Sequence, residues 1–115
     1  MDNARLLVVA MSEQCKCQIQ EFQGQARQLP MSLRLSHLKW MCDRVKQHAD
    51  DWTEIRSHRW IGFIQCAMIA HGILELAEAK QMFDTLKVAY GEVGDDLVDH
   101  LDAASSFEVD IGGEG

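Results

Sequence analysis

The stretch HRWIGFIQCAMIAHG, residues 58–72, constrains the fold of this chain more than any other part of the sequence. A helix that is apolar around most of its circumference is usually the one buried among the others. Gly72 supplies the left-handed residue that closes a helix at low steric cost. We therefore predict a central helix over about residues 53–71, with Trp60 and Phe63 one turn apart on a packing face. The apolar residues expected to cover it are Ile55, Trp60, Phe63, Ile64, Ala67, Met68 and Ile69.

Three further segments have the apolar spacing of amphipathic helices. The first covers about residues 3–28, with Asn3 as its cap, and ends before Pro30 because proline disfavours helical geometry in the preceding residue. The second covers residues 32 to 48 or 49, and the last covers residues 75–90. Asp51 or Thr53 is expected to cap the central helix. The expected inward-facing residues are Leu7, Met11, Cys15, Ile19 and Phe22, then Leu35, Leu38, Met41, Cys42 and Val45, and finally Leu76, Ala79, Phe83, Leu86 and Tyr90.

These segments predict an all-α, single-domain fold resembling a four-helix bundle with short antiparallel connections. A chain of 115 residues with 47% apolar and 25% charged residues is an ordinary globular domain in size and composition. We assign residues 1–91 to the helical domain. Residues 92–115 form an acidic C-terminal segment, helical or extended, which either belongs to the same domain or forms an arm.

The sequence also predicts a cytoplasmic protein with reduced thiols. No stretch reaches the roughly 18 uninterrupted apolar residues that a membrane span requires. The N-terminus lacks the basic region and the small-residue cleavage site of a signal peptide.

Charge is distributed very unevenly along the chain. Residues 1–91 hold all 11 lysines and arginines against 10 acids, whereas residues 92–115 hold 8 acids and no lysine or arginine. Apolar residues alternate with these acids, and a purely solvating tail would not need them. Such a segment can dock on a basic protein partner, or it can pack on its own helices or on a second copy in a homodimer. The residues predicted to bind a partner are Asp95, Asp96, Asp99, Asp102, Phe107, Glu108, Val109, Asp110 and Ile111.

The four cysteines and five histidines show no spacing typical of a metal or catalytic site. Cys15 and Cys17 would point about 200° apart on a helix, which is poor geometry for holding one zinc ion. His58 and His71 are thirteen residues apart, too far to share a metal on one helix. We therefore predict no catalytic residue, no metal and no cofactor. A pair formed only in space, such as Cys42 with His71, remains the alternative.

A basic cluster on the second segment is the one sign of nucleic-acid binding. Its residues are Arg34, Lys39, Arg44 and Lys46, with Trp40 interleaved. The −8 charge of residues 92–115 opposes contact with a phosphate backbone. We predict no direct nucleic-acid binding and read the cluster as a solvated helix face.

The stretch RWIGFIQCAMIAHGILELAEAKQMF, residues 59–83, contains an Arg-Trp-(Ile/Leu)-Gly-Phe-(Ile/Val)-Gln motif followed by a glycine. It resembles a segment of small uncharacterised helical proteins encoded by phages and prophages, and LSHLKWMCDRV at residues 35–45 resembles the segment that precedes it. The resemblance covers about half the chain and implies a mobile-element origin and a small helical fold, with no established activity. Cys66 departs from the family, where glycine often follows the glutamine. The matching residues are Arg59, Trp60, Gly62, Phe63, Gln65 and Gly72.

Together these features favour a non-enzymatic accessory protein of phage or mobile-element origin. It would dock on a host or phage protein through its acidic segment, in one form as an inhibitor that mimics nucleic-acid charge. Two alternatives remain: a structural homo-oligomeric phage component, and a metal-binding or Cys/His enzyme module.

Overall fold

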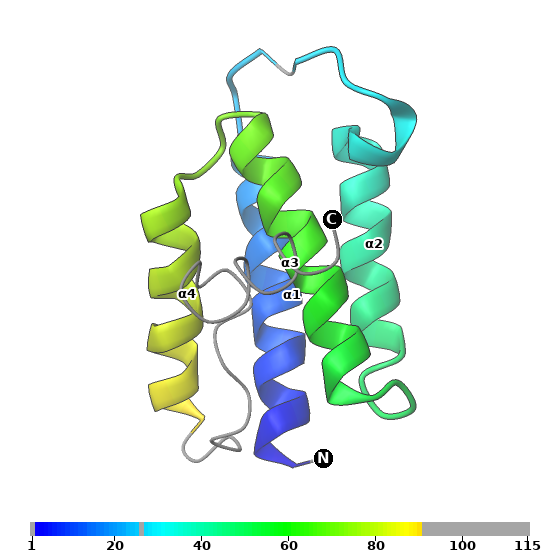
Figure 1. Cartoon of the computed structure of the whole chain (residues 1–115), viewed down its shortest axis with the longest axis vertical. Coiled ribbons are helices and arrows are strands. Elements are labelled where there is room, and N and C mark those ends of the chain that lie inside the picture. The colour runs from blue at the N-terminus through cyan, green and yellow to red at the C-terminus, as the bar shows by residue number, and fades with distance from the viewer. Residues whose placement is uncertain (1, 26, 91–115) are drawn as a thin grey trace, which may run out of the picture.

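The computed structural model in Figure 1 describes residues 2–25 and 27–90 of the chain. Within these residues the fold is all-α, as predicted, and contains no β-strand. No helix in this part of the chain combines the length and the apolar character needed to cross a bilayer. The elements are α1 (Asn3–Glu21), the 3₁₀ turn η1 (Met31–Leu33), α2 (Leu35–Gln47), α3 (Glu54–Ala70) and α4 (Leu76–Ala89).

Consecutive helices run antiparallel, so the chain passes up, down, up and down through the bundle (Figure 1). The α1 helix packs against each of the other three, while α2 and α4 lie on opposite sides of the α1–α3 pair. This arrangement confirms the bundle-like prediction. It leaves α2 and α3 as neighbours along one side of the molecule, where the candidate site lies.

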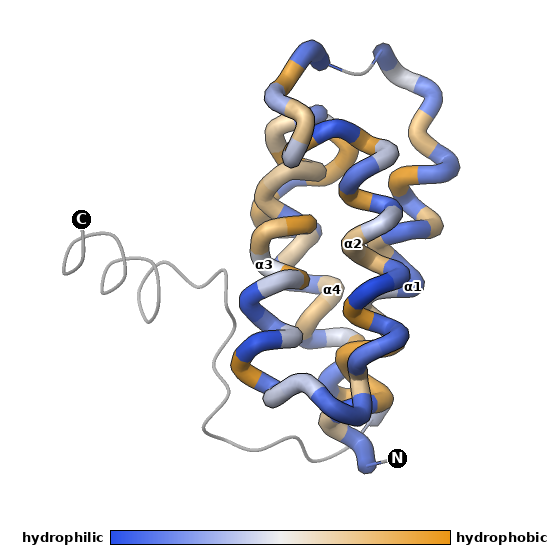
Figure 2. Tube along the Cα trace, turned by 90° about the vertical axis from the view of Figure 1, so that its right-hand side faces the viewer, coloured by the Kyte–Doolittle hydropathy of each residue, from blue (hydrophilic) through white to orange (hydrophobic). Residues whose placement is uncertain are grey.

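The core forms where the predicted apolar stripes of α1 and α2 meet α3. Along α1 and α2, hydrophilic and apolar residues alternate as expected for helices with one buried side (Figure 2). Each large aliphatic side chain that is fully buried contributes about 1.5–3 kcal/mol through removal of its surface from water. The largest fully buried apolar side chains are Leu7, Met11, Leu38, Ile61, Ile64, Met68, Val8 and Val45.

The helix boundaries follow from local capping. The Asp2 side chain accepts a hydrogen bond from the N–H of Arg5 at 2.9 Å, so Asp2 caps α1 in place of the predicted Asn3, which is already helical. Thr53, one of the two predicted caps of α3, accepts from the N–H of Arg56 at 3.1 Å. Gly72 follows α3 with a φ of 78°, which confirms the left-handed closing residue.

The prediction that the first helix continues to residue 28 is wrong, because α1 ends at Glu21. Phe22 turns to an extended conformation, and its N–H closes the last turn on the carbonyl of Ile19 at 3.3 Å. The Phe22 ring then folds onto Gly24, with its Cζ only 2.6 Å from where a β-carbon on that glycine would lie. The linker crosses one end of the bundle, and α2 begins at Leu35 rather than Ser32, after the separate turn η1.

Two of the predicted inward-facing residues on α3 are also placed wrongly. Phe63 is 40% exposed and Ile55 is 63% exposed, whereas Ile61, which the pattern did not single out, is fully buried. Successive residues turn by about 100° along a helix, and the face centred on Ile61 and Ile64 meets α1 and α2. On α4, Leu76 is likewise exposed, and Met82 is buried in its place.

Candidate binding surface

All three tryptophans of the chain meet in one row where α2, α3 and the turn between them come together. The ring centroids of Trp52 and Trp60 are 4.6 Å apart, and those of Trp40 and Trp60 are 6.3 Å apart. His48 stacks on Trp52 at 4.8 Å with an interplanar angle of 4°, and His37 lies 5.2 Å from Trp40. We call these five residues the aromatic row.

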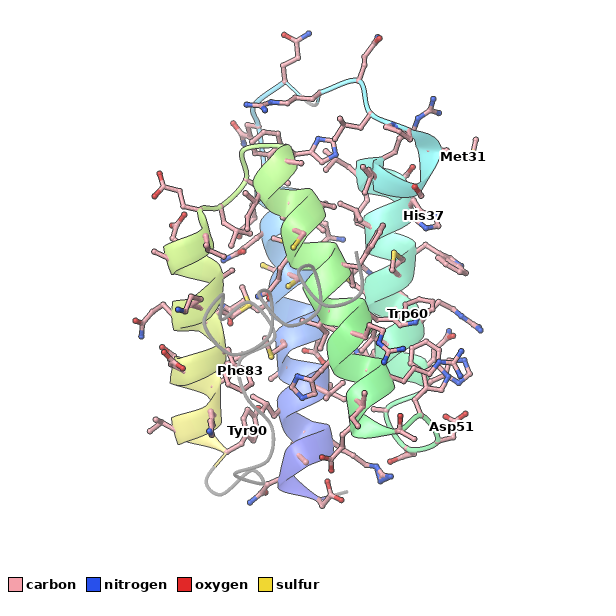
Figure 3. All side chains as sticks on the ribbon, in the orientation of Figure 1. Met31, His37, Asp51, Trp60, Phe83 and Tyr90 are labelled. Atoms are coloured by element: carbon pink, nitrogen blue, oxygen red, sulfur yellow. The ribbon has the colours of Figure 1, made fainter. Side chains whose placement is uncertain are left out.

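The turn between α2 and α3 positions the buried end of this row. The backbone N–H groups of Asp51 and Trp52 both donate to the carbonyl of His48, at 3.1 and 2.8 Å. His48 Nδ1 also lies 3.0 Å from the Asp51 carboxylate, and this hydrogen bond holds the pKa of Asp51 below its usual value. In Figure 3, His37, Trp60 and Asp51 follow one another down the side of the bundle where α2 and α3 meet.

Two arginines cover the tryptophan rings. The Arg56 Cζ lies 4.3 Å from the ring centroid of Trp52, and the Arg44 Cζ lies 5.7 Å from that of Trp40. Such cation–π contacts contribute about 0.5–1 kcal/mol each at exposed positions. They hold planar cationic groups against planar aromatic ones and so rigidify the surface.

Exposure increases along the row. Trp52 is 7% exposed and belongs to the core, Trp60 is partly buried, and Trp40 is 50% exposed. Trp52 therefore anchors the row, while Trp40 presents an aromatic face to solvent.

Two residues of the predicted basic cluster on α2 already have partners within the protein. Lys46 Nζ pairs with the Glu13 carboxylate on α1 at 3.3 Å, and Arg44 lies over Trp40. On the same α1–α2 seam, Lys16 pairs with Asp43 at 2.8 Å. Exposed ion pairs contribute only about 0–1 kcal/mol each. Their effect here is to reduce the cationic charge that α2 offers to a phosphate backbone.

The cysteines and histidines that the structure describes do not assemble into a recognisable metal site. Among residues 2–25 and 27–90, no group of three His, Cys, Asp or Glu side chains could hold an ion. The alternative pair of Cys42 and His71 is not brought together. His71 Nε2 contacts the carbonyl of Leu33 just before α2, whereas Cys42 lies seven residues, about 10 Å, past the start of that helix at Leu35.

None of the four cysteine thiols has the lowered pKa that would favour the thiolate form. Burial raises the pKa of Cys42 to about 12 and raises that of Cys15 still further. The carboxylate of Glu21 raises the pKa of Cys17, and partial burial raises that of Cys66. A nucleophilic cysteine needs the opposite shift.

Thiol labelling checks this arrangement. We expect the folded protein to react with Ellman's reagent at Cys17 and Cys66 only, because these two are exposed, while Cys15 and Cys42 are buried. The buried pair should react only after guanidinium is added. Rapid labelling of Cys42 in the folded protein, or a thiol that titrates below pH 7, would favour the Cys/His enzyme alternative instead.

The residues of the phage-like motif do not form one site. Gln65 is fully buried, with its Nε2 3.4 Å from the Met82 sulfur, whereas Arg59 and Phe63 are exposed. Gly62 is partly buried and Trp60 belongs to the aromatic row. The predicted partner-binding residues, 95–111, lie outside the described residues. Sequence reasoning did not find Trp52, His48 or Arg56 as members of a surface, although a tryptophan between two helical segments was a usable signal.

Comparison with protein-family models, curated proteins and solved structures gave no match to this chain.

Proposed function

We propose that the protein is a non-enzymatic interaction protein that docks on a protein partner. The observation that carries this proposal is the aromatic row, which has a buried anchor at Trp52 and a half-exposed end at Trp40. Tryptophan and arginine are the residues most enriched in the energetically dominant positions of protein interfaces. The Trp40 ring already contacts His37, Trp60 and Arg44. A ring held in this way loses little conformational freedom on binding, so less binding energy is spent on ordering it.

The acidic segment, residues 92–115, supplies the second part of the proposal. Its eight carboxylates and complete lack of lysine and arginine would attract a basic surface on the partner. Long-range attraction of this kind raises the association rate and fixes the orientation of docking. A partner with a nucleic-acid-binding groove has this chemistry, so the segment would compete with nucleic acid there.

The resemblance to phage- and prophage-encoded proteins leads us to propose a mobile-element origin and a role in the bacterial cytoplasm. The rival proposal is a structural homo-oligomer, in which the aromatic row of one copy packs on another. Affinity capture distinguishes the two proposals, because a homo-oligomer would recover only further copies of its own chain.

Affinity capture from bacterial lysate with four full-length chains tests the proposal. They are the wild type, Trp40→Ala, a chain whose eight acids in residues 92–115 are changed to the matching amides, and Val88→Ala. Val88 is 83% exposed on α4, across the bundle from α2, so its variant controls for loss of an exposed apolar side chain.

We expect the wild type and the Val88→Ala chain to recover the same partner. Trp40→Ala should weaken binding of that purified partner about 30-fold, the effect of losing a contact worth about 2 kcal/mol. The chain with amides in place of its eight acids should bind more slowly at low salt, and its association rate should lose most of its salt dependence. Identical recovery by all four chains would contradict the proposal, and recovery of the chain alone with a fixed multimer in light scattering would favour the homo-oligomer.

A further inference from the structure

The side of α3 that is turned away from α1 is apolar and exposed. Figure 1 shows α3 in front of α1, with α2 and α4 on either side, so this side of α3 faces the viewer. Ile55 is 63% exposed, Phe63 is 40% exposed and Cys66 is also exposed. A helix on the surface of a bundle normally turns polar residues outward. Contiguous apolar surface in their place marks an interaction site.

The exposed residues have the spacing at which one helix packs on another. They recur at alternating steps of four and three along α3, which is the 3.5-residue repeat of paired helices. Gly62 and Cys66, at the centre of the repeat, have short side chains that let a second helix approach closely. The residues of this repeat, which we call the outer face of α3, are Ile55, Arg59, Gly62, Cys66 and Ile69.

The charge of the outer face selects an acidic occupant. From Ile55 to Ala70, α3 contains no acidic residue, and Arg59 is exposed in the middle of this stretch. Arg59 forms no ion pair with a carboxylate of residues 2–25 or 27–90. A helix that carries carboxylates beside an apolar side would therefore match both the apolar surface and the guanidinium group.

The chain itself continues into a segment with this chemistry. Residues 95–104, DDLVDHLDAA, place Leu97, Val98 and Leu101 at positions i, i+1 and i+4, the spacing of one apolar side of a helix. The aspartates of this stretch fall on the remaining sides, since successive residues turn by about 100° along a helix. No lysine or arginine follows Tyr90 in the sequence.

The end of α4 lies where this segment could reach α3. The α4 helix ends at Ala89, at the same end of the bundle at which α3 begins (Figure 1). Residues 91–94, if extended, span about 13 Å, more than the roughly 8–10 Å between the axes of neighbouring helices. A ten-residue helix is about 15 Å long, enough to cover about ten residues of α3.

We propose that residues 95–104 form a short helix that docks on the outer face of α3. Leu97 and Leu101 pack on the apolar side chains of this face, and an aspartate at the edge of the docked helix pairs with Arg59. The other carboxylates stay in water and form one ordered acidic surface on the bundle. The inference goes beyond the proposed function, because it concerns a contact within this chain and holds whether or not the segment also meets a partner.

The rate of thiol labelling in the full-length protein tests this inference, because Cys66 lies in the covered face. A ten-residue helix is marginal alone, so docking is reversible and Cys66 still reacts in the folded protein, but slowly. In the variant Leu97→Ser/Leu101→Ser we expect N-ethylmaleimide to label Cys66 about tenfold faster, as for a face covered about 90% of the time. The matched control, Val109→Ser/Ile111→Ser, removes two apolar side chains outside the docked helix and should leave the rate unchanged.

The other cysteines serve as internal references. Cys17 is exposed on α1 and should react equally fast in all three proteins, while the buried Cys15 and Cys42 should stay unlabelled. The inference is overturned if Leu97→Ser/Leu101→Ser leaves the Cys66 rate unchanged, or if the control raises it equally. Protection of Cys66 that grows with protein concentration would also overturn it, because a second copy would then cover the face.

Hydrogen exchange in the wild type gives a second readout that needs no variant. We expect slowed exchange at the amides of residues 98–104 and free exchange at those of residues 108–115, since only docked helical amides are shielded by hydrogen bonds. Free exchange throughout residues 91–115 would contradict docking.

Discussion

Replacing Trp52 with alanine is expected to lower the free energy of unfolding by about 3–5 kcal/mol, the usual cost of deleting a large buried aromatic side chain. Trp52 is 7% exposed and contacts His48, Trp60 and Arg56. Its loss would leave a cavity beneath the turn that joins α2 to α3. Urea denaturation measured by circular dichroism gives the change directly.

The control is Trp40→Ala in the same row. Because Trp40 is 50% exposed, its replacement should cost about 1 kcal/mol or less. Equal destabilisation by the two substitutions would mean that Trp40 is also structural. In that case, weaker partner binding by Trp40→Ala could not be assigned to the interface.

Acidification from pH 7 to pH 4.5 should destabilise the protein by about 2 kcal/mol through His58 alone. Burial lowers the pKa of His58 from its ordinary value of 6.5 to about 4. Between these two values the unfolded chain binds a proton that the folded chain does not. The contribution of His58 is therefore fully present above pH 6.5 and is lost as the pH falls towards 4.

The variant His58→Leu isolates this effect from the titration of the carboxylates. The imidazole packs edge-on against Phe83, with ring centroids 6.0 Å apart, and leucine keeps an apolar contact there without a titrating group. The difference in unfolding free energy between pH 7 and pH 4.5 should be about 2 kcal/mol smaller in the variant. The same difference in both proteins would show that His58 is accessible to protons in the folded state.

The helices and most of the core could be predicted from the sequence because apolar spacing reports burial directly. The stripes Leu7–Met11–Cys15 and Leu38–Cys42–Val45 are buried as expected. The end of α1 could not be placed, since residues 22–28 include glutamines that are compatible with a helix. In the structure the helix ends where Phe22 turns to an extended conformation and its ring folds onto Gly24.

The candidate site was beyond sequence reasoning for a different reason. Trp40 lies on α2, Trp52 in the turn that follows it and Trp60 on α3, and only the antiparallel packing of α2 on α3 brings their rings together. In the same way, His71 contacts the carbonyl of Leu33, 38 residues earlier in the chain. The spacing of residues along one helix carries no information about contacts between different elements.

The most direct test of the central claim, that the exposed end of the aromatic row contacts a protein partner, is site-specific photo-cross-linking in bacterial cells. The photoreactive residue p-benzoylphenylalanine would replace Trp40 in one full-length chain and Val88 in another. We expect a discrete adduct with a different protein from position 40 and none from position 88. No adduct from position 40, the same adducts from both positions, or an adduct only with a second copy of this chain would contradict it.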